Sequence, residues 1–263
     1  MKNPLKWKVF FILWIATIFS VIAVLPYSLE LQSGILQNLE LPVPLPTLLA
    51  IQVIQNSILF GMLIAAGLFL AGRIGLGLPI LESRLRGEPT AEQIRSIVPV
   101  SLLTGLIASL LIVGLELVLF QPMLLQEFGE GADALVLSGD QPAAWKGFFA
   151  SFYGGIVEEI LLRLFLMSLL AWLGSFVLKT TEGKPAPSVF WMANILAAII
   201  FGIAHLPATA TILPLTALVV TRAVVLNGVA GVAFGYLYWK RGLESAMLAH
   251  FSADLVLHVL LAL

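Results

Sequence analysis

The sequence predicts an all-α protein, a polytopic bundle of seven, or at most eight, transmembrane helices. Its 263 residues are 60% hydrophobic and only 11% charged, with a mean hydropathy of +1.03. A soluble domain has about 45–50% apolar and about 25% charged residues. Several apolar runs also reach the roughly 20 residues that a helix needs to cross a bilayer. The lipid bilayer is therefore the expected surrounding, and the net charge of −1 makes nucleic acid an unexpected partner.

The first helix is expected over Val9–Leu25, directly after Lys2, Lys6 and Lys8. A cleaved signal peptide is the alternative interpretation. The apolar run is rather long for a signal peptide, and no clear small-x-small cleavage site follows it. The sequence therefore favours an uncleaved helix whose N-terminus lies in the cytoplasm.

The next three helices alternate in direction according to the charge of the segments between them. Arg73–Ser96 is rich in arginine and is predicted to be cytoplasmic, whereas Tyr27–Pro46 and Gln121–Ala144 form loops without Lys or Arg and are predicted to lie outside. Glu116 lies near the outer end of its helix and is expected at the interface. The three helices are predicted over Thr47–Gly72, Ile97–Phe120 and Trp145–Val177.

The last third of the chain leaves the helix number open. Val189–Thr221 is too long for one straight span and contains Pro207 and Pro214, so it is interpreted as a kinked or broken fifth helix. Splitting it at Pro207 would give eight helices but would place Lys240 and Arg241 outside, so the positive-inside rule favours seven. The sixth and seventh helices are expected over Ala223–Trp239 and Leu243–Leu263.

A cluster of charges inside the fourth helix indicates a functional site within the bundle. Glu158, Glu159 and Arg163 lie in an apolar run, where one charge costs on the order of 3 kcal/mol. Glu159 and Arg163 are four residues apart, so they share a helix face and can pair. Glu158 points about 100° away from Glu159. One carboxylate is thus expected to be neutralised and the other to remain available.

Two histidines on later helices complete the candidate site. His205 precedes the break at Pro207, and His250 shares a helix face with Asp254 four residues later. Together with Glu158 they suggest water activation, with Glu158 as the base and His205 positioning the water. His250 would donate to an oxyanion from one ring nitrogen, while Asp254 accepts from the other. A buried ion network that only fixes helix packing is the structural alternative.

The residues leave the activation of the water open between two mechanisms. Two histidines and one glutamate are a known catalytic zinc set, so Glu158, His205 and His250 could hold zinc, or Glu158 could act without metal. The sequence contains no cysteine, which excludes a thiol nucleophile. No Gly-x-Ser-x-Gly elbow and no His-Glu-x-x-His pattern is present.

The chain resembles the CPBP family, the CAAX-protease and bacteriocin-processing (Abi) intramembrane proteases that include the type II CAAX prenyl endopeptidases. The resemblance covers roughly residues 145–263, within an expected single membrane domain of residues 1–263. It is carried by three motifs on successive apolar helices, Glu158-Glu159-x-x-x-Arg163, Phe201-x-x-x-His205 and His250-x-x-x-Asp254.

The resemblance implies an intramembrane endopeptidase whose site opens from the cytoplasmic leaflet. It also implies that Glu158 and His205 activate water and that His250 and Asp254 form the oxyanion hole. Many members have Asn at the last of these positions. Asn donates a hydrogen bond and an ionised Asp does not, so Asp254 either is protonated or orients His250.

The predicted function is hydrolysis of a peptide bond in a membrane-associated peptide or protein, in a multi-pass protein of a prokaryotic plasma membrane. Two other classes are open. A scaffold or immunity protein of the same family would bind a membrane partner without catalysis. A transporter would use the carboxylates and histidines as a proton relay, although no internal duplication supports it.

Overall fold

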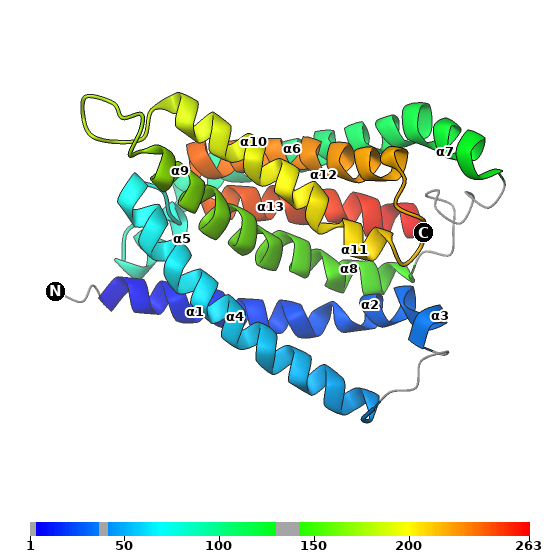
Figure 1. The fold of residues 1–263 in the computed structure, drawn as a ribbon. Coiled ribbons are helices and arrows are strands. Elements are labelled where there is room, and N and C mark those ends of the chain that lie inside the picture. The colour runs from blue at the N-terminus through cyan, green and yellow to red at the C-terminus, as the bar shows by residue number, and fades with distance from the viewer. Residues whose placement is uncertain (1–3, 37–41, 130–141) are drawn as a thin grey trace.

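The computed structural model describes residues 4–36, 42–129 and 142–263. It confirms the all-α bundle, since no β-strand occurs in these residues and long helices run side by side (Figure 1). Six helical segments of the described chain are long and apolar enough to cross a bilayer. They are Lys6–Leu31, Leu45–Ile74, Ala91–Phe128, Pro187–Thr209, Ala217–Arg241 and Leu243–Ala262.

The first span extends further than the sequence predicts. Helix α1 covers Pro4–Ala23, and α2 (Leu25–Leu31) continues it with only a slight break. A short helix, α3, follows at Ser33–Leu36. The segment from Tyr27 was expected to be a loop and is partly helical, because Leu29 and Leu31 extend the apolar run past Pro26, a residue tolerated in the first turn of a helix.

The second and third spans enclose the arginine-rich segment. Helix α4 runs over Leu45–Ile74 and ends at Gly75, whose φ of 78° is the left-handed conformation of a helix C-terminus. A short helix, α5 (Pro79–Leu85), leads to α6 (Ala91–Leu115). After α6 come a π-helical turn, Glu116–Phe120, and α7 (Gln121–Phe128). The remainder of the predicted outer loop, residues 130–141, lies outside the described residues.

A seventh helical segment carries the charged motif. It begins with α8 (Ala144–Phe152) and ends with α9 (Ser168–Gly174). Between them the helix is wound in the wider π form over Tyr153–Glu158 and Ile160–Met167. The whole run is continuous and exceeds the roughly 20 residues that a span needs, although its three motif charges distinguish it from the six apolar spans.

The predicted break near Pro207 is present. Helix α10 covers Pro187–Ala204, and the single-turn helix α11 (Leu206–Thr209) ends it. Helix α12 then begins at Ala217, six residues before the predicted start, and runs to Arg241. Thr216 caps it by accepting from the backbone N–H of Val219.

The last span is divided between three helix types. Helix α13 covers Leu243–Asp254, followed by a π-helical turn at Leu255–Val259 and a 3₁₀ turn at Leu260–Ala262. The two chain ends lie at opposite ends of the bundle (Figure 1). An odd number of crossings produces this arrangement, as seven spans do and eight do not.

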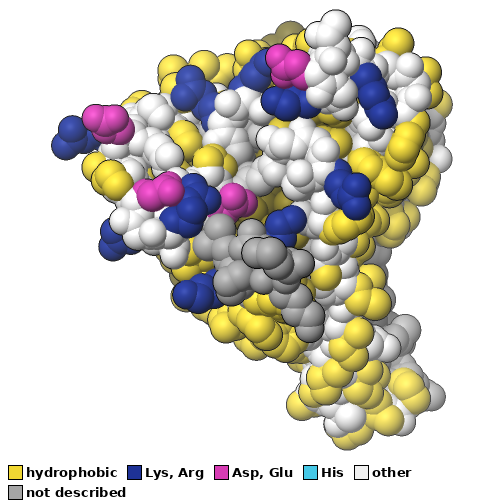
Figure 2. Space-filling model, turned by 90° about the vertical axis from the view of Figure 1, so that its left-hand side faces the viewer, with side chains coloured by type: hydrophobic (Ala, Val, Ile, Leu, Met, Phe, Trp, Pro, Cys, Tyr) yellow, Lys and Arg dark blue, Asp and Glu magenta, His cyan; other side chains and the backbone are white. Residues whose placement is uncertain are grey.

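The end of the bundle nearest the N-terminus carries the charged side chains. Figure 2 faces this end and shows Lys and Arg side chains gathered on it, with hydrophobic side chains along the flanks. The segments that reach it include the ends of α4 and α12, the helix α5 and the turn before α10. The prediction that the N-terminus is cytoplasmic was based on such an excess of Lys and Arg between the spans.

Candidate active site

The candidate site lies where the π-wound run between α8 and α9 passes α13, at the centre of the bundle (Figure 1). Glycines allow this close approach. A Cβ added at Gly154 would overlap the carboxylate of Asp254 and lie 3.0 Å from Nε2 of His250. One at Gly155 would lie 2.9 Å from Cβ of Phe251. The Gly-Gly pair therefore brings the backbone of the motif against the polar face of α13.

His250 is the centre of the site and contacts three carboxylates. Its Nδ1 lies 2.8 Å from Oε1 of Glu159. Its Nε2 lies 3.6 Å from Oε2 of Glu158 and 3.6 Å from Oδ1 of Asp254. The ring of Phe234 stacks on the imidazole at a centroid distance of 4.9 Å. The imidazole is thus held by one close hydrogen bond on one side, while its other nitrogen faces two carboxylates.

Glu159 and Arg163 form the pair that their spacing predicts. Nη1 of Arg163 lies 3.0 Å from Oε1 of Glu159, and the two side chains are 2% and 0% exposed. Nη2 of Arg163 donates to the carbonyl of Gly231 on α12 at 2.9 Å. Glu159 forms an ion pair with Arg163, and a carboxylate in an ion pair accepts hydrogen bonds. Nδ1 of His250 must therefore carry the proton of their shared hydrogen bond.

Two successive glutamates reach one imidazole from a π-wound stretch of the helix. In an ordinary α-helix Glu158 and Glu159 would point about 100° apart. The wider π-helical turns on either side of Glu159 reduce this angle, and such turns are frequent at functional sites. Glu158 remains the more accessible of the two, with 23% of its side chain exposed. As predicted from the spacing, Glu159 is paired with Arg163, whereas Glu158 is accessible.

Asp254 differs from its predicted position, whereas the predicted role of His205 stays a prediction. Asp254 was expected to hold the ring nitrogen of His250 that does not face the reaction, but Glu159 occupies that position and Asp254 lies beside Glu158 at Nε2. His205 was expected to share a water with Glu158. Its Nδ1 donates to the carbonyl of Phe201 at 2.8 Å, which leaves Nε2 for such a water, and no described carboxylate contacts either ring nitrogen directly within 4.0 Å. The Phe201 ring contacts both histidine rings.

The donor set for a metal is incomplete in the described residues. They contain no group of three or more His, Asp or Glu side chains arranged to hold a metal ion. Glu158, His205 and His250 therefore do not converge as a zinc site requires, and the chemistry below uses only the side chains of the chain itself.

Sequence reasoning missed a second buried ion pair. Glu116 was expected at the interface and is instead buried, with 1% of the residue exposed. Nε of Arg222 on α12 lies 2.7 Å from its Oε2. Arg222 lies in the apolar helix α12, and a charge inside a membrane span needs a partner. Glu116 is the one carboxylate in the apolar part of the third span. The sequence therefore offered it as the partner of Arg222.

The fold and the site together define a multi-pass integral membrane protein with a buried carboxylate–histidine site. Residues 140–256 match the family model described as Type II CAAX prenyl endopeptidase Rce1-like. This match contains all three motifs and confirms the family resemblance over that part of the chain. The family supports a CAAX-type intramembrane protease kind of function. No curated protein and no solved structure matches the chain.

Proposed function

We propose that this chain is an intramembrane endopeptidase that hydrolyses a peptide bond of a membrane-associated peptide or protein. The observation that carries the proposal is the pairing of the buried His250 with Glu159 at Nδ1, while Nε2 faces Glu158 and Asp254. A packing network would need only the Glu159–Arg163 pair to satisfy its charges. The additional carboxylates at Nε2 place two more acidic groups around one imidazole inside a membrane, which is costly unless they are used.

Glu158 is the general base of the proposed reaction. It is the most exposed member of the cluster, so water and the scissile carbonyl can reach its carboxylate. It takes a proton from water as the oxygen attacks the carbonyl carbon, and later gives this proton to the leaving amine. His205 assists from the end of α10. Because its Nδ1 donates to the Phe201 carbonyl, Nε2 is left as an acceptor that can orient the same water.

His250 stabilises the oxyanion of the tetrahedral intermediate. Glu159 fixes the orientation of its ring through Nδ1, so Nε2 is aimed at the space beside Glu158 and Asp254. With Nε2 protonated, the ring donates a hydrogen bond to the oxyanion in a site shielded from bulk water, where such a bond is strong. Asp254 balances the charge of that imidazolium from 3.6 Å.

The test is cleavage of a peptide library by the full chain in liposomes. Glu158→Gln removes the base while keeping the size of the side chain, and it is expected to lower kcat by about 100-fold or more. Glu92→Gln on the exposed first turn of α6 removes the same charge away from the site and should leave kcat unchanged. Equal cleavage by the wild type and the Glu158→Gln variant would disprove the mechanism and favour a scaffold.

A further inference from the structure

A groove opens between the first two spans, in the half of the bundle that lies away from the N-terminus. Figure 1 shows α4 crossing α1 and diverging from α2 toward that end. The two walls meet where Nε1 of Trp14 on α1 donates to the carbonyl of Ser57 on α4 at 2.8 Å. Beyond this contact they enclose a cavity of about 370 Å³, which is lined by residues of α1 to α4 and by Tyr153 of the motif-bearing helix.

The lining of this groove is apolar with neutral polar side chains and contains no charged residue of the described chain. Valines and leucines come from both walls. The polar side chains are Ser28, Gln32, Gln52, Asn56 and Tyr153, and none of them has a side-chain hydrogen bond within the described residues. Asn56 lies about 16 Å along α4 from the first residue of that helix, at a rise of about 1.5 Å per residue. An amide without a partner is costly at that depth of a membrane, so a ligand with hydrogen-bonding groups is expected.

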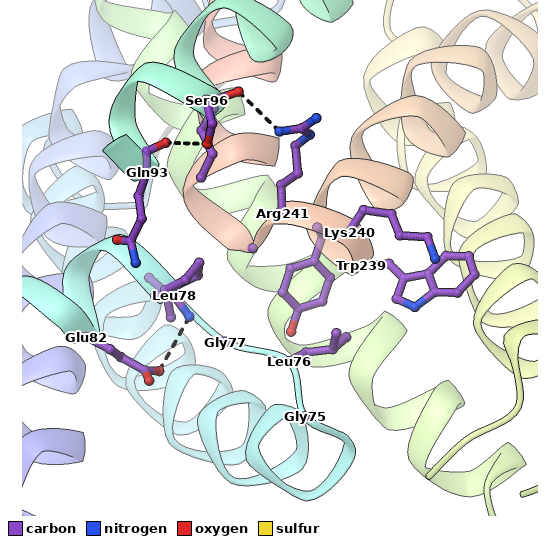
Figure 3. A pocket seen from close by; sticks show the side chains of 14 residues that line it. Gly75, Leu76, Gly77, Leu78, Glu82, Gln93, Ser96, Trp239, Lys240 and Arg241 are labelled. Carbon is purple, nitrogen blue, oxygen red and sulfur yellow. Dashed lines mark hydrogen bonds between the residues drawn. The ribbon is translucent and has the colours of Figure 1, made fainter. Parts of the chain in front are cut away.

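The larger cavity at the charged end of the bundle is of a different kind (Figure 3). Charged side chains on its walls already have partners within the protein. Nη1 of Arg241 donates to the carbonyl of Ser96 at 3.2 Å, and Oε2 of Glu82 lies 3.9 Å from Nη1 of Arg86. The groove between α2 and α4 differs because its polar side chains lack such partners.

The spacing of these polar side chains matches an extended peptide. Gln52 and Asn56 are four residues apart on one face of α4, so about 6 Å separates them along the groove. Ser28 and Gln32 have the same spacing on the α2 wall. In an extended chain every second residue points to the same side, about 6.6–6.8 Å further along. The two polar side chains on each wall can therefore pair with peptide groups on both edges of one extended segment.

Other membrane ligands use this lining less well. An acyl chain has no hydrogen-bonding group for the amides, and a phosphate or carboxylate head group would need a cation that the lining does not offer. A helical segment has already paired its backbone groups internally. An extended apolar peptide carries both free backbone groups and apolar side chains, so it fits both parts of the lining.

The groove is connected to the catalytic helices at two places. The hydroxyl of Tyr27 on α2 forms a 3.1 Å hydrogen bond with Nδ1 of His258, one turn after Asp254. This bond holds the α2 wall against the helix that carries the proposed oxyanion site. Tyr153 and Glu158 begin and end one π-helical stretch, so a peptide that contacts Tyr153 lies beside the turn that carries the proposed base.

We propose that the groove binds an extended, uncharged segment of the peptide substrate through its backbone. Gln52 and Asn56 pair with peptide groups along one edge, and Ser28 and Gln32 pair with those along the other. This assignment rests on the proposed peptidase function and defines its substrate as a membrane segment that has left the helical conformation. The groove lies in the half of the bundle opposite to the cytoplasmic opening that the family resemblance implies, so the segment enters from that half.

The test measures peptide binding to the full-length Glu158→Gln variant in detergent by fluorescence anisotropy, so that hydrolysis does not consume the peptide. The first probe is a capped, fluorescent hexapeptide of alternating alanine and leucine. The second is the same peptide with a methyl group on every peptide nitrogen, which removes the N–H donors and keeps the apolar side chains. The unmodified peptide should bind at least tenfold more tightly, because each lost hydrogen bond is worth about fivefold in affinity.

Variants of both walls locate the binding. Gln52→Leu and Asn56→Leu suit a membrane helix and should each weaken the unmodified peptide about fivefold. Ser28→Ala should weaken it by a similar factor from the opposite wall, so the result does not depend on α4 alone. Gln55→Leu is the matched control and should leave the affinity unchanged, because Gln55 is exposed on the same helix and does not line the groove.

Two results would overturn the assignment. Equal affinity for the two peptides would show that the groove holds an apolar chain and not a peptide backbone. Unchanged affinity in the Gln52→Leu and Asn56→Leu variants would show that the peptide binds elsewhere.

Failure of the peptidase proposal would look different. In that case the wild type would cleave no peptide of the library in liposomes, while the binding pattern of the groove variants stays as expected. Cleavage by the wild type that persists with unchanged kcat/KM in the Gln52→Leu and Asn56→Leu variants would instead retain the peptidase and reject the groove.

Discussion

Replacing Gly154 by alanine tests whether the close contact between the motif and α13 is needed for activity. The new Cβ would overlap the Asp254 carboxylate and lie 3.0 Å from Nε2 of His250, whereas ordinary contacts are 3.4–4 Å. Relief of this overlap requires the two backbones to separate by about 1 Å or Asp254 to rotate away. A misplacement of about 1 Å can cost roughly 100-fold in rate. The expected loss in kcat is therefore about 100-fold.

The accompanying loss of stability is expected to be smaller. Overpacking a well-packed contact costs about 1–3 kcal/mol, so the variant should fold and melt a few degrees below the wild type. The assay combines kcat on a cleaved peptide with thermal melting in detergent. Gly114→Ala is the matched control, because no atom lies within 4 Å of a Cβ added there. It should keep full activity and lose no stability.

Two outcomes would refute this reasoning. Full activity of the Gly154→Ala variant would show that the contact between the motif and α13 does not position the reacting groups. An equal loss in the Gly114→Ala variant would show that alanine affects any helical glycine of this bundle, so that the effect is not local to the site.

Two further predictions concern helix packing away from the site. Arg222→Leu leaves the buried carboxylate of Glu116 without its partner and should destabilise the chain by about 3–5 kcal/mol. Adding Glu116→Gln to the same chain should restore the melting temperature. If the double variant melts as low as the single one, the two residues do not act as a pair. Gly235→Ala would place a Cβ 2.7 Å from Cγ of Asn194 and should lower the melting temperature, whereas Gly228→Ala, with its nearest contact at 3.9 Å, should not.

The sequence predicts the bundle well because membrane helices follow local rules. Apolar runs, prolines and the distribution of Lys and Arg locate each span, although several spans extend beyond their predicted ends, and the break after His205 follows from Pro207. The ion pair between Glu159 and Arg163 is also local, since four residues separate them. These features depend on neighbours in sequence, so periodicity alone can predict them.

The parts that could not be predicted depend on contacts between distant segments. The hydrogen bond from His250 to Glu159 joins residues 91 positions apart, and α-helical geometry would have directed only one of the two glutamates toward α13. Both contact the imidazole in a stretch that is π-wound, a feature without a sequence rule. The exchange of roles between Glu159 and Asp254 likewise depends on how this stretch packs against α13.

That exchange gives the last prediction, which contrasts Asp254→Asn with Glu159→Gln. If Glu159 alone fixes the His250 ring, replacing Asp254 by the isosteric Asn leaves the tautomer unchanged, and the new amide can itself donate to the oxyanion. The Asp254→Asn variant should keep kcat within about threefold of the wild type. Glu159→Gln removes the acceptor at Nδ1 and leaves Arg163 buried without its counterion, so a loss of 100-fold or more is expected.

The pH dependence of kcat/KM separates this assignment from a merely structural role of Glu159. A variant that has lost only stability keeps the wild-type pH profile in its folded fraction, whereas loss of the carboxylate at Nδ1 changes the proton affinity of His250 and moves the profile. The expected result is a moved profile for Glu159→Gln and an active Asp254→Asn variant. If Asp254→Asn is inactive while Glu159→Gln keeps both its rate and its profile, Asp254 orients the imidazole, and the position of Glu159 at Nδ1 serves packing alone.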